Sequence, residues 1–158
     1  MDEKAYYHSP IGIIELTGSN AGISSLYFVD DYTEKNHIPA NLRACVKQLD
    51  EYFKKKRKIF ELKLNPDGTE FQKTVWNKLQ DIPYGKAVSY LEIAKSLGNK
   101  NATRAVGNAN GKNKISVIIP CHRVIGINGK LTGYAGGLKR KKWLLDFENS
   151  SKQTSLFD

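Results

Sequence analysis

The alternation of apolar and polar residues divides this chain into two differently built halves. Residues 4–29 alternate with a period of about two, which predicts three short strands. Residues 39–53 instead predict an amphipathic helix whose apolar side carries Leu42, Cys45, Leu49 and Phe53. A small sheet with one helix predicts an α/β amino-terminal lobe over residues 1–66, in which Cys45 is a packed core thiol.

The second half has the spacing of helices. Thr69 and Gln72 form a capping box, which marks the start of a second lobe at residues 67–148. Apolar residues around a basic run predict a helix that closes this lobe near Glu148. The remaining residues, 149–158, are mostly polar and are expected to form a flexible tail.

Two short helices joined by a tight turn are predicted inside the second lobe. The first begins at the capping box of Ser89 and Glu92 and ends at Gly98. The second is capped by Asn101, has a face of small residues and ends before Gly111. This spacing predicts a helix-turn-helix. The fold class is therefore an α/β lobe followed by a mostly helical lobe with a winged-helix-like DNA-binding motif.

A candidate nucleophile follows the most apolar run of the second lobe. Residues 115–119 predict a short buried strand, and Pro120 ends its ladder just before Cys121 and His122. A thiol is nucleophilic as a thiolate, which a nearby imidazole promotes. Adjacent strand residues point to opposite faces, so a buried structural cysteine is the alternative. With Glu148 as an orienting acid, the set matches the nucleophile, base and acid of covalent catalysis.

The charge distribution indicates a polyanionic partner. The 158 residues have a net charge of +9. Residues 1–70 carry ten basic and eleven acidic groups, a net charge of −1, whereas residues 71–158 carry fifteen and five, a net charge of +10. The basic half is therefore expected to meet a nucleic acid, with a solvated basic surface as the alternative.

The two cysteines and the apolar stretches limit the class of protein. Cys45 and Cys121 lie far apart and neither belongs to a C-x-x-C pair, which argues against a cysteine-based zinc site and suits a reducing cytoplasm. The longest apolar stretches are far shorter than the ~20 residues that span a bilayer. We therefore expect no membrane segment.

A series of motifs runs in fixed order through the first 148 residues. They are Y-Y-H-S-P-I-G, G-T-E-F-Q-K-x-V-W, I-P-Y-G, S-Y-x-x-I-A, R-A-V-G-x-A, P-C-H-R-V, I-G-x-x-G-K-L-x-G-Y-A-G-G-L and W-L-L-x-x-E. Together they closely resemble the O6-alkylguanine-DNA alkyltransferases, also called methylated-DNA–protein-cysteine methyltransferases. The first motif is similar to that of the bacterial single-protein members.

The resemblance implies DNA repair by direct, stoichiometric and irreversible transfer of an alkyl group to Cys121. The donor would be O6-alkylguanine, and also O4-alkylthymine, in double-stranded DNA. His122 would deprotonate the thiol through a bound water, and Glu148 would hold the imidazole. No cofactor and no metal are expected, and the protein is expected to be a cytoplasmic monomer.

The resemblance also implies how the damaged base is reached. The second helix of the helix-turn-helix would enter the minor groove, where Ala105 and Gly107 permit a close approach. Tyr90 would promote rotation of the nucleotide out of the duplex, and Arg104 would fill the space it leaves. A solvated Arg104 and a packed Tyr90 are the alternatives.

Inside the pocket, the resemblance assigns most contacts to the backbone. The carbonyls of Cys121 and Val124 would accept from the exocyclic amine of guanine, and the backbone at Tyr134 and Ala135 would face O6. Tyr90 would donate to N3. Asn113 would tie the recognition helix to the active-site strand through backbone hydrogen bonds.

Departures from the family pattern are few. Lys114 follows Asn113 where a proline is usual, which makes that connection less rigid. The zinc ligands of certain animal members have no counterparts in residues 1–40. Cys121 excludes the non-repairing relatives that carry tryptophan there.

Two other classes of protein remain as alternatives. A transcription regulator would use the helix-turn-helix without a reactive thiol, but no dimerising repeat or ligand domain is apparent. A cysteine hydrolase would use the thiol and imidazole repeatedly, which leaves the basic half unexplained.

The carboxyl-terminal tail carries a motif of its own. Its residues Gln153, Leu156 and Phe157 resemble the Q-x-S/D-L-F peptide by which bacterial repair proteins dock on the sliding clamp. A sliding clamp is thus a second expected partner. The alternatives are an accidental match, or apolar residues that fold back onto the protein.

Overall fold

The computed structural model describes residues 2–32 and 37–156, with side chains described as far as residue 149. The chain forms two compact units, residues 1–67 and 68–158, which are described separately here. The expected boundary, between residues 66 and 67, lies one residue earlier. The predicted fold class, an α/β lobe followed by a helical DNA-binding lobe, is confirmed.

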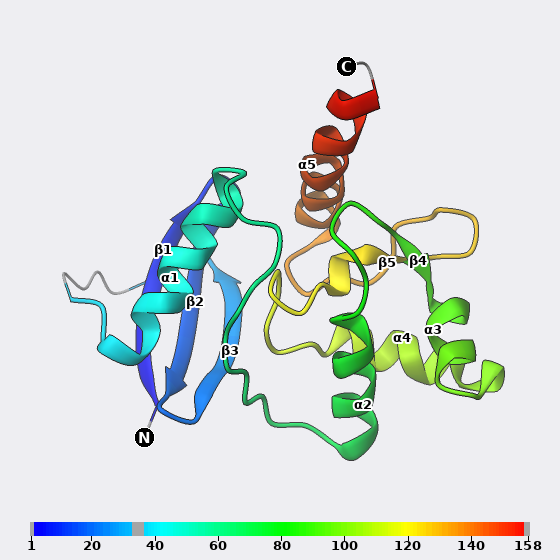
Figure 1. The fold of residues 1–158 in the computed structure, drawn as a ribbon. Helices are drawn as coiled ribbons and strands as arrows, with labels where there is room; N and C mark the ends of the chain where they lie inside the picture. The colour runs from blue at the N-terminus through cyan, green and yellow to red at the C-terminus, as the bar shows by residue number, and fades with distance from the viewer. Residues whose placement is uncertain (1, 33–36, 157–158) are drawn as a thin grey trace. The chain divides into compact units, whose positions relative to one another are not determined.

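The first unit is an antiparallel meander covered by one helix (Figure 1). Its strands are β1 (Glu3–Ser9), β2 (Gly12–Ser19) and β3 (Gly22–Val29), and its helix is α1 (Ala40–Phe53). The core between sheet and helix contains Ile14, Leu16, Leu26, Leu42 and Leu49, all fully buried. Cys45 is buried in this core, as predicted.

The second unit begins with α2 (Glu70–Leu79), and the predicted capping box is present. The Thr69 hydroxyl accepts from the Gln72 amide at 3.1 Å, and the Gln72 side chain accepts from the Thr69 amide at 3.0 Å. Trp76 of α2 is buried and donates through Nε1 to the Ala109 carbonyl at 2.8 Å. The capped helix is thereby fastened to the helix that carries Ala109.

The helix-turn-helix consists of α3 (Tyr90–Ser96), a 3-10 helix η1 (Lys100–Ala102) and α4 (Thr103–Gly111). The Ser89 hydroxyl caps α3 by accepting from the Glu92 amide. The expected cap at Asn101 is wrong, because the Asn99 side chain caps η1 and accepts from the Asn101 amide at 3.0 Å. The second α-helix therefore starts one residue later than predicted, at Thr103.

The predicted strand at 115–119 is also wrong. The segment forms tight turns, with Val117 in the left-handed region at φ 72°. The Asn113 side chain replaces a strand ladder, since it accepts from the Ile115 amide at 3.0 Å and donates to the Ile119 carbonyl at 2.8 Å. Asn113 thus links the end of α4 to a turn rather than to a strand.

The remaining elements frame the thiol. A short parallel pair joins β4 (Val88–Ser89) to β5 (Val124–Ile125), directly after the 3-10 helix η2 (Cys121–Arg123). The last helix, α5 (Leu138–Leu156), packs against η2 (Figure 1). It continues past Glu148, where the closing helix was expected to end, because neither glycine nor proline follows. No helix in the described part of the chain is long and apolar enough to cross a membrane.

Candidate active site

Cys121 lies at the first position of η2 and is almost completely buried. Burial raises the pKa of its thiol to about 11, while the Asn113 amide and the charge of Lys141 act in the opposite direction. The thiol is therefore protonated near neutral pH. Its use as a nucleophile requires a base within the same enclosed space.

His122 has the geometry of such a base. Its ring is fully buried, and Nε2 lies 2.8 Å from the Glu148 carboxylate. Because a carboxylate can only accept, Nε2 carries the proton and Nδ1 is left with a lone pair. Among the described residues, Nδ1 has no hydrogen-bond partner. Burial lowers the pKa of His122 despite the opposing effect of Glu148, so the neutral ring is favoured.

Arg123 completes this network, and our reading of the sequence gave it no role. Its Nε and Nη2 donate to the two oxygens of Glu148 at 2.8 and 3.0 Å, and Nη1 donates to the Ile82 carbonyl at 2.7 Å. Burial alone would raise the pKa of Glu148, but His122 and Arg123 hold it well below its usual range. The carboxylate is thus ionised and fixed from two sides. The position of a basic residue directly after a Cys-His pair is the feature of the sequence that could have indicated this role.

A second group of polar contacts joins Tyr90, Thr132 and Lys141. The Tyr90 hydroxyl lies 3.2 Å from the Thr132 carbonyl and 3.1 Å from the Thr132 hydroxyl. Lys141, from α5, donates to the same carbonyl at 2.6 Å. Asn110 is also buried, and its Nδ2 donates to the Cys121 carbonyl at 3.4 Å. Neither Lys141 nor Asn110 stands out in the sequence, because each lies among other polar residues.

The predicted substrate-contacting residues differ in exposure. Val124 and Tyr134 are buried, Tyr90 is half-buried and Ala135 is exposed. Burial raises the pKa of Tyr134 well above its usual value, and the charge state of Cys121 adds to this effect. Of these four residues, Val124 and Tyr134 are therefore enclosed by the second unit, Tyr90 is partly accessible, and Ala135 lies at the surface.

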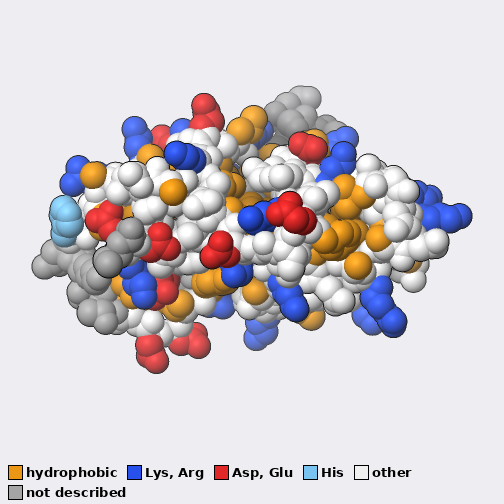
Figure 2. Space-filling model, turned by 90° about the horizontal axis from the view of Figure 1, so that it is seen from below, with side chains coloured by type: hydrophobic (Ala, Val, Ile, Leu, Met, Phe, Trp, Pro, Cys, Tyr) orange, Lys and Arg blue, Asp and Glu red, His pale blue; other side chains and the backbone are white. Residues whose placement is uncertain are grey.

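The predicted DNA-contacting residues lie along α4. Arg104 and Ala105 are exposed, and Gly107 is half-buried. A Cβ atom added to Gly107 would lie 3.8 Å from the Tyr90 ring, an ordinary contact distance. Figure 2 shows Lys and Arg side chains projecting from the right-hand end of the molecule, where α3 and α4 lie in Figure 1. The exposed Arg104 of α4 thus has the exposed Lys95 of α3 and Lys100 of η1 on the elements that contact its helix.

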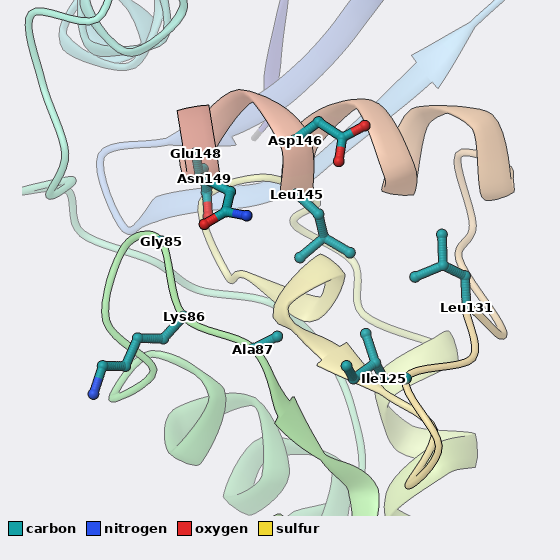
Figure 3. A pocket seen from close by; sticks show the side chains of 10 residues that line it. Gly85, Lys86, Ala87, Ile125, Leu131, Leu145, Asp146, Glu148 and Asn149 are labelled. Atoms are coloured by element: carbon teal, nitrogen blue, oxygen red, sulfur yellow. The ribbon is translucent and has the colours of Figure 1, made fainter. Parts of the chain in front are cut away.

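A separate hollow of about 310 Å³ lies behind this network. Figure 3 shows Ala87, Ile125, Leu131 and Leu145 around it, between β5 and α5. Glu148 also lines it, whereas Cys121 does not. Among the described residues, no group of three or more His, Cys, Asp or Glu side chains could hold a metal ion.

Two family models match the chain and together cover both units. Residues 3–66 match the ribonuclease-like domain of 6-O-methylguanine DNA methyltransferase, and residues 70–150 match its DNA-binding domain. The methylated-DNA–protein-cysteine methyltransferase of Methanosarcina acetivorans is 48% identical over 155 residues, which cover 92% of this chain and 97% of that protein. The enzyme of Mycolicibacterium paratuberculosis is 45% identical, with 95% of each chain covered.

Solved structures give the same result. The O6-methylguanine methyltransferase of Mycobacterium tuberculosis is 42% identical and superimposes with a TM-score of 0.87 over 100% of both chains. The same protein in complex with DNA gives a TM-score of 0.84 at 44% identity, with 97% of this chain and 98% of that chain covered. Since sequence and structure agree over both units, the chain belongs to the methylated-DNA–protein-cysteine methyltransferases, the O6-methylguanine-DNA methyltransferase family.

Proposed function

We propose that Cys121 is the cysteine to which this DNA-repair methyltransferase transfers the methyl group of O6-methylguanine. The observation that carries the proposal is the state of His122, whose Nε2 proton is held by Glu148 while Nδ1 has no partner among the described residues. A buried acceptor next to a buried thiol is suited to receive a proton from it through one bridging water. Cys121 and His122 need not touch, which removes the objection from strand geometry.

The chemical step is a displacement at the methyl carbon. The thiol proton passes to His122 through the water, the sulfur forms a bond to the methyl carbon, and the carbon–O6 bond breaks. Guanine leaves with the electron pair of that bond and takes up a proton, so that the base departs neutral. The S-methyl thioether that forms is not cleaved by water, since a thiolate would have to leave from an unactivated methyl carbon, and Cys121 therefore accepts once.

The surrounding residues are proposed to hold the extruded base. The carbonyls of Cys121 and Val124 accept from the exocyclic amine, and the backbone at Tyr134 and Ala135 faces O6. Tyr90 donates to N3, for which its hydroxyl must turn away from Thr132. The burial of Val124 and Tyr134 supports this arrangement, because a dry pocket strengthens each hydrogen bond to the base.

Base extrusion is proposed to start from α4. The exposed Arg104 fills the space left in the duplex, while Ala105 and Gly107 let the helix approach the minor groove closely. Tyr90 promotes rotation of the nucleotide toward the thiol. Asn113 couples this helix to the active site, since its side chain bonds both ends of the turn that precedes Cys121.

One assay tests the acceptor and the stoichiometry together. The protein is incubated with a duplex that contains O6-methylguanine and is then weighed intact. We expect one methyl group per molecule, located at Cys121 by peptide mapping, and none on Cys121→Ser. Several lesions repaired per molecule would indicate a hydrolase-like turnover, and binding without repair would indicate a regulator. A second duplex with O4-methylthymine tests the wider substrate range, for which we expect slower transfer to the same thiol.

A sliding clamp is proposed as a further partner on the sequence of the tail alone. Gln153 and Leu156 lie in the last turns of α5, where side chains are not described, and Phe157 lies outside the described residues. A synthetic peptide of residues 149–158 is expected to bind a bacterial sliding clamp with a Kd of roughly micromolar size. The double substitution of Leu156 and Phe157 by alanine should abolish binding and leave methyl transfer on short duplexes intact. Absence of binding by the unmodified peptide would dispose of the idea.

A further inference from the structure

Lys141 is a fully buried lysine in the middle of a basic run. Its neighbour Lys142 keeps a side chain that is 66% exposed and pairs with Asp146 at 2.7 Å. Lys141 instead points into the second unit and is 0% exposed. The helical period explains the difference, because Lys141 shares the inward face of α5 with Leu144 and Glu148.

The burial of this charge is not compensated by a carboxylate. Among the described residues, Lys141 forms no ion pair. Glu148, on the same face of the helix, uses both carboxylate oxygens to bind His122 and Arg123. A buried lysine without a counter-ion is unfavourable, and such groups concentrate at functional sites.

Within the described part of the chain, the Lys141 side chain has one hydrogen bond, which it donates to the loop residue Thr132. Nζ donates to the Thr132 carbonyl at 2.6 Å, the same carbonyl that the Tyr90 hydroxyl approaches. Nζ also lies 5.9 Å from the centre of the Tyr90 ring. The ammonium group is thus held in place beside the aromatic ring that faces the substrate.

Electrostatics connect this ammonium group to the thiol. Burial lowers the pKa of Lys141 to about 8, and Cys121 is the group that raises it again. In return, Lys141 lowers the pKa of Cys121, as does the Asn113 amide. Lys141 also contributes to keeping His122 neutral. Among the described residues, Cys121 is the ionisable group whose negative charge would favour the protonated form of Lys141.

We propose that Lys141 is a positioning residue whose buried positive charge serves as the counter-ion of the Cys121 thiolate. The Thr132 carbonyl holds the charge in place, so no reorganisation is needed when the thiol loses its proton. His122 removes the proton, the Asn113 amide favours the thiolate, and Lys141 supplies the opposite charge. This inference rests on the proposed role of Cys121 as the acceptor.

Three substitutions separate the effect of the Lys141 charge from the effect of its hydrogen bond and from the effect of removing any positive charge from α5. Lys141→Met removes both with little change in shape, whereas Lys141→Gln removes the charge and retains an N–H donor for Thr132. Lys142→Met removes one charge from the same helix at the exposed position next to it. Each variant is compared with the wild type and with Cys121→Ser in single-turnover reactions with the free base O6-benzylguanine, so that DNA binding does not contribute.

The measured quantity is the rate of Cys121 alkylation as a function of pH. We expect Lys141→Met and Lys141→Gln to react about tenfold more slowly at pH 7, with the rise of the profile moved about one pH unit upward. Lys142→Met should follow the wild type. Thermal unfolding at pH 7 should show Lys141→Met at or above the wild-type midpoint, because below pH 8 the folded state carries the cost of the buried charge.

The outcomes distinguish a failure of the Lys141 counter-ion role from a failure of the Cys121 acceptor role. An unshifted profile in Lys141→Met, or a wild-type profile restored by Lys141→Gln, overturns the counter-ion role, since the lysine then acts through packing or through its hydrogen bond. Lower thermal stability with an unshifted profile does the same. If the wild type itself gains no alkyl group at Cys121, the proposed function fails independently of Lys141.

Discussion

The two thiols of this protein are both buried, yet their surroundings differ in kind. Cys45 lies in the apolar core of the first unit, where burial raises its pKa to about 12 and no other group acts on it strongly enough to compete. Cys121 lies in the second unit, where Asn113 and Lys141 oppose the effect of burial. The comparison shows that burial alone raises the pKa of a thiol and keeps it protonated, and therefore unreactive, near neutral pH. The reactivity proposed for Cys121 depends on buried polar groups near it, which the fold holds in place through their other hydrogen bonds.

The most decisive test of this comparison replaces Cys121 and leaves Cys45 in place. Cys121→Ser should lose methyl transfer completely, because a serine hydroxyl has no accessible anion at neutral pH. The measurement is the intact mass after incubation with a methylated duplex. A residual methyl adduct on Cys121→Ser would move the acceptor to Cys45 and reverse the comparison.

The next largest effect is expected at Glu148. Glu148→Gln removes the charge that supports His122 and leaves Arg123 without its ionic partner, so transfer at pH 7 should fall about a hundredfold and the pH profile should move upward. Binding to undamaged DNA is the control and should be unchanged. A profile that does not move would make Glu148 a structural residue.

The same carboxylate predicts how stability depends on pH. Its folded pKa is held below the unfolded value of about 4.5, so the stabilisation is present above that value and is lost as pH falls through the folded pKa. Glu148→Gln should therefore lower stability near pH 7 by about 3 kcal/mol. Urea unfolding at pH 7 and at pH 3 measures it, and the difference between variant and wild type should shrink at the lower pH.

A smaller effect, confined to duplex DNA, is expected at Arg104. Arg104→Ala should slow repair in a duplex by about tenfold and leave the reaction with a free O6-alkylguanine base within about twofold, because only the duplex requires extrusion. Parallel single-turnover assays on the two substrates measure the ratio. Equal losses on both would contradict a role in base flipping.

The smallest effect on transfer is expected at Cys45. Cys45→Ala should transfer methyl groups at the wild-type rate, since the first unit contributes no proposed reaction residue. It should lower the free energy of unfolding by about 1 kcal/mol through the cavity it creates. Denaturant unfolding and the mass assay together test this. A loss of transfer without a loss of stability would give Cys45 a part in the reaction.

The sequence predicted the family, the two-lobe fold, the capping box of Thr69 and Gln72, the Ser89 cap and the helix-turn-helix, because local spacing carries each of them. It failed at residues 115–119, where an apolar run looks like a strand. The turn depends on three-dimensional bonds from Asn113 that no periodicity reveals. The left-handed backbone of Val117 could not be predicted either, because β-branched residues rarely adopt a positive φ.

The sequence also could not separate Lys141 from the basic residues beside it. In the run from 139 to 142 every residue is basic, and a run of that kind is normally a solvated surface. Only packing decides which one faces inward. Arg123 was missed for a related reason, since its partner Glu148 lies 25 residues away in the chain.

Two side chains that we propose to act at the site, Lys141 and Glu148, lie on one helix, which limits how this protein can vary over time. Lys141 and Glu148 are seven residues apart on α5, which is about two turns or roughly 10 Å along its axis. One inserted or deleted residue between them would rotate one side chain by about 100° relative to the other. Descendants of this gene can therefore exchange residues in that interval, but they cannot change its length and still keep the cation and the carboxylate at the same site.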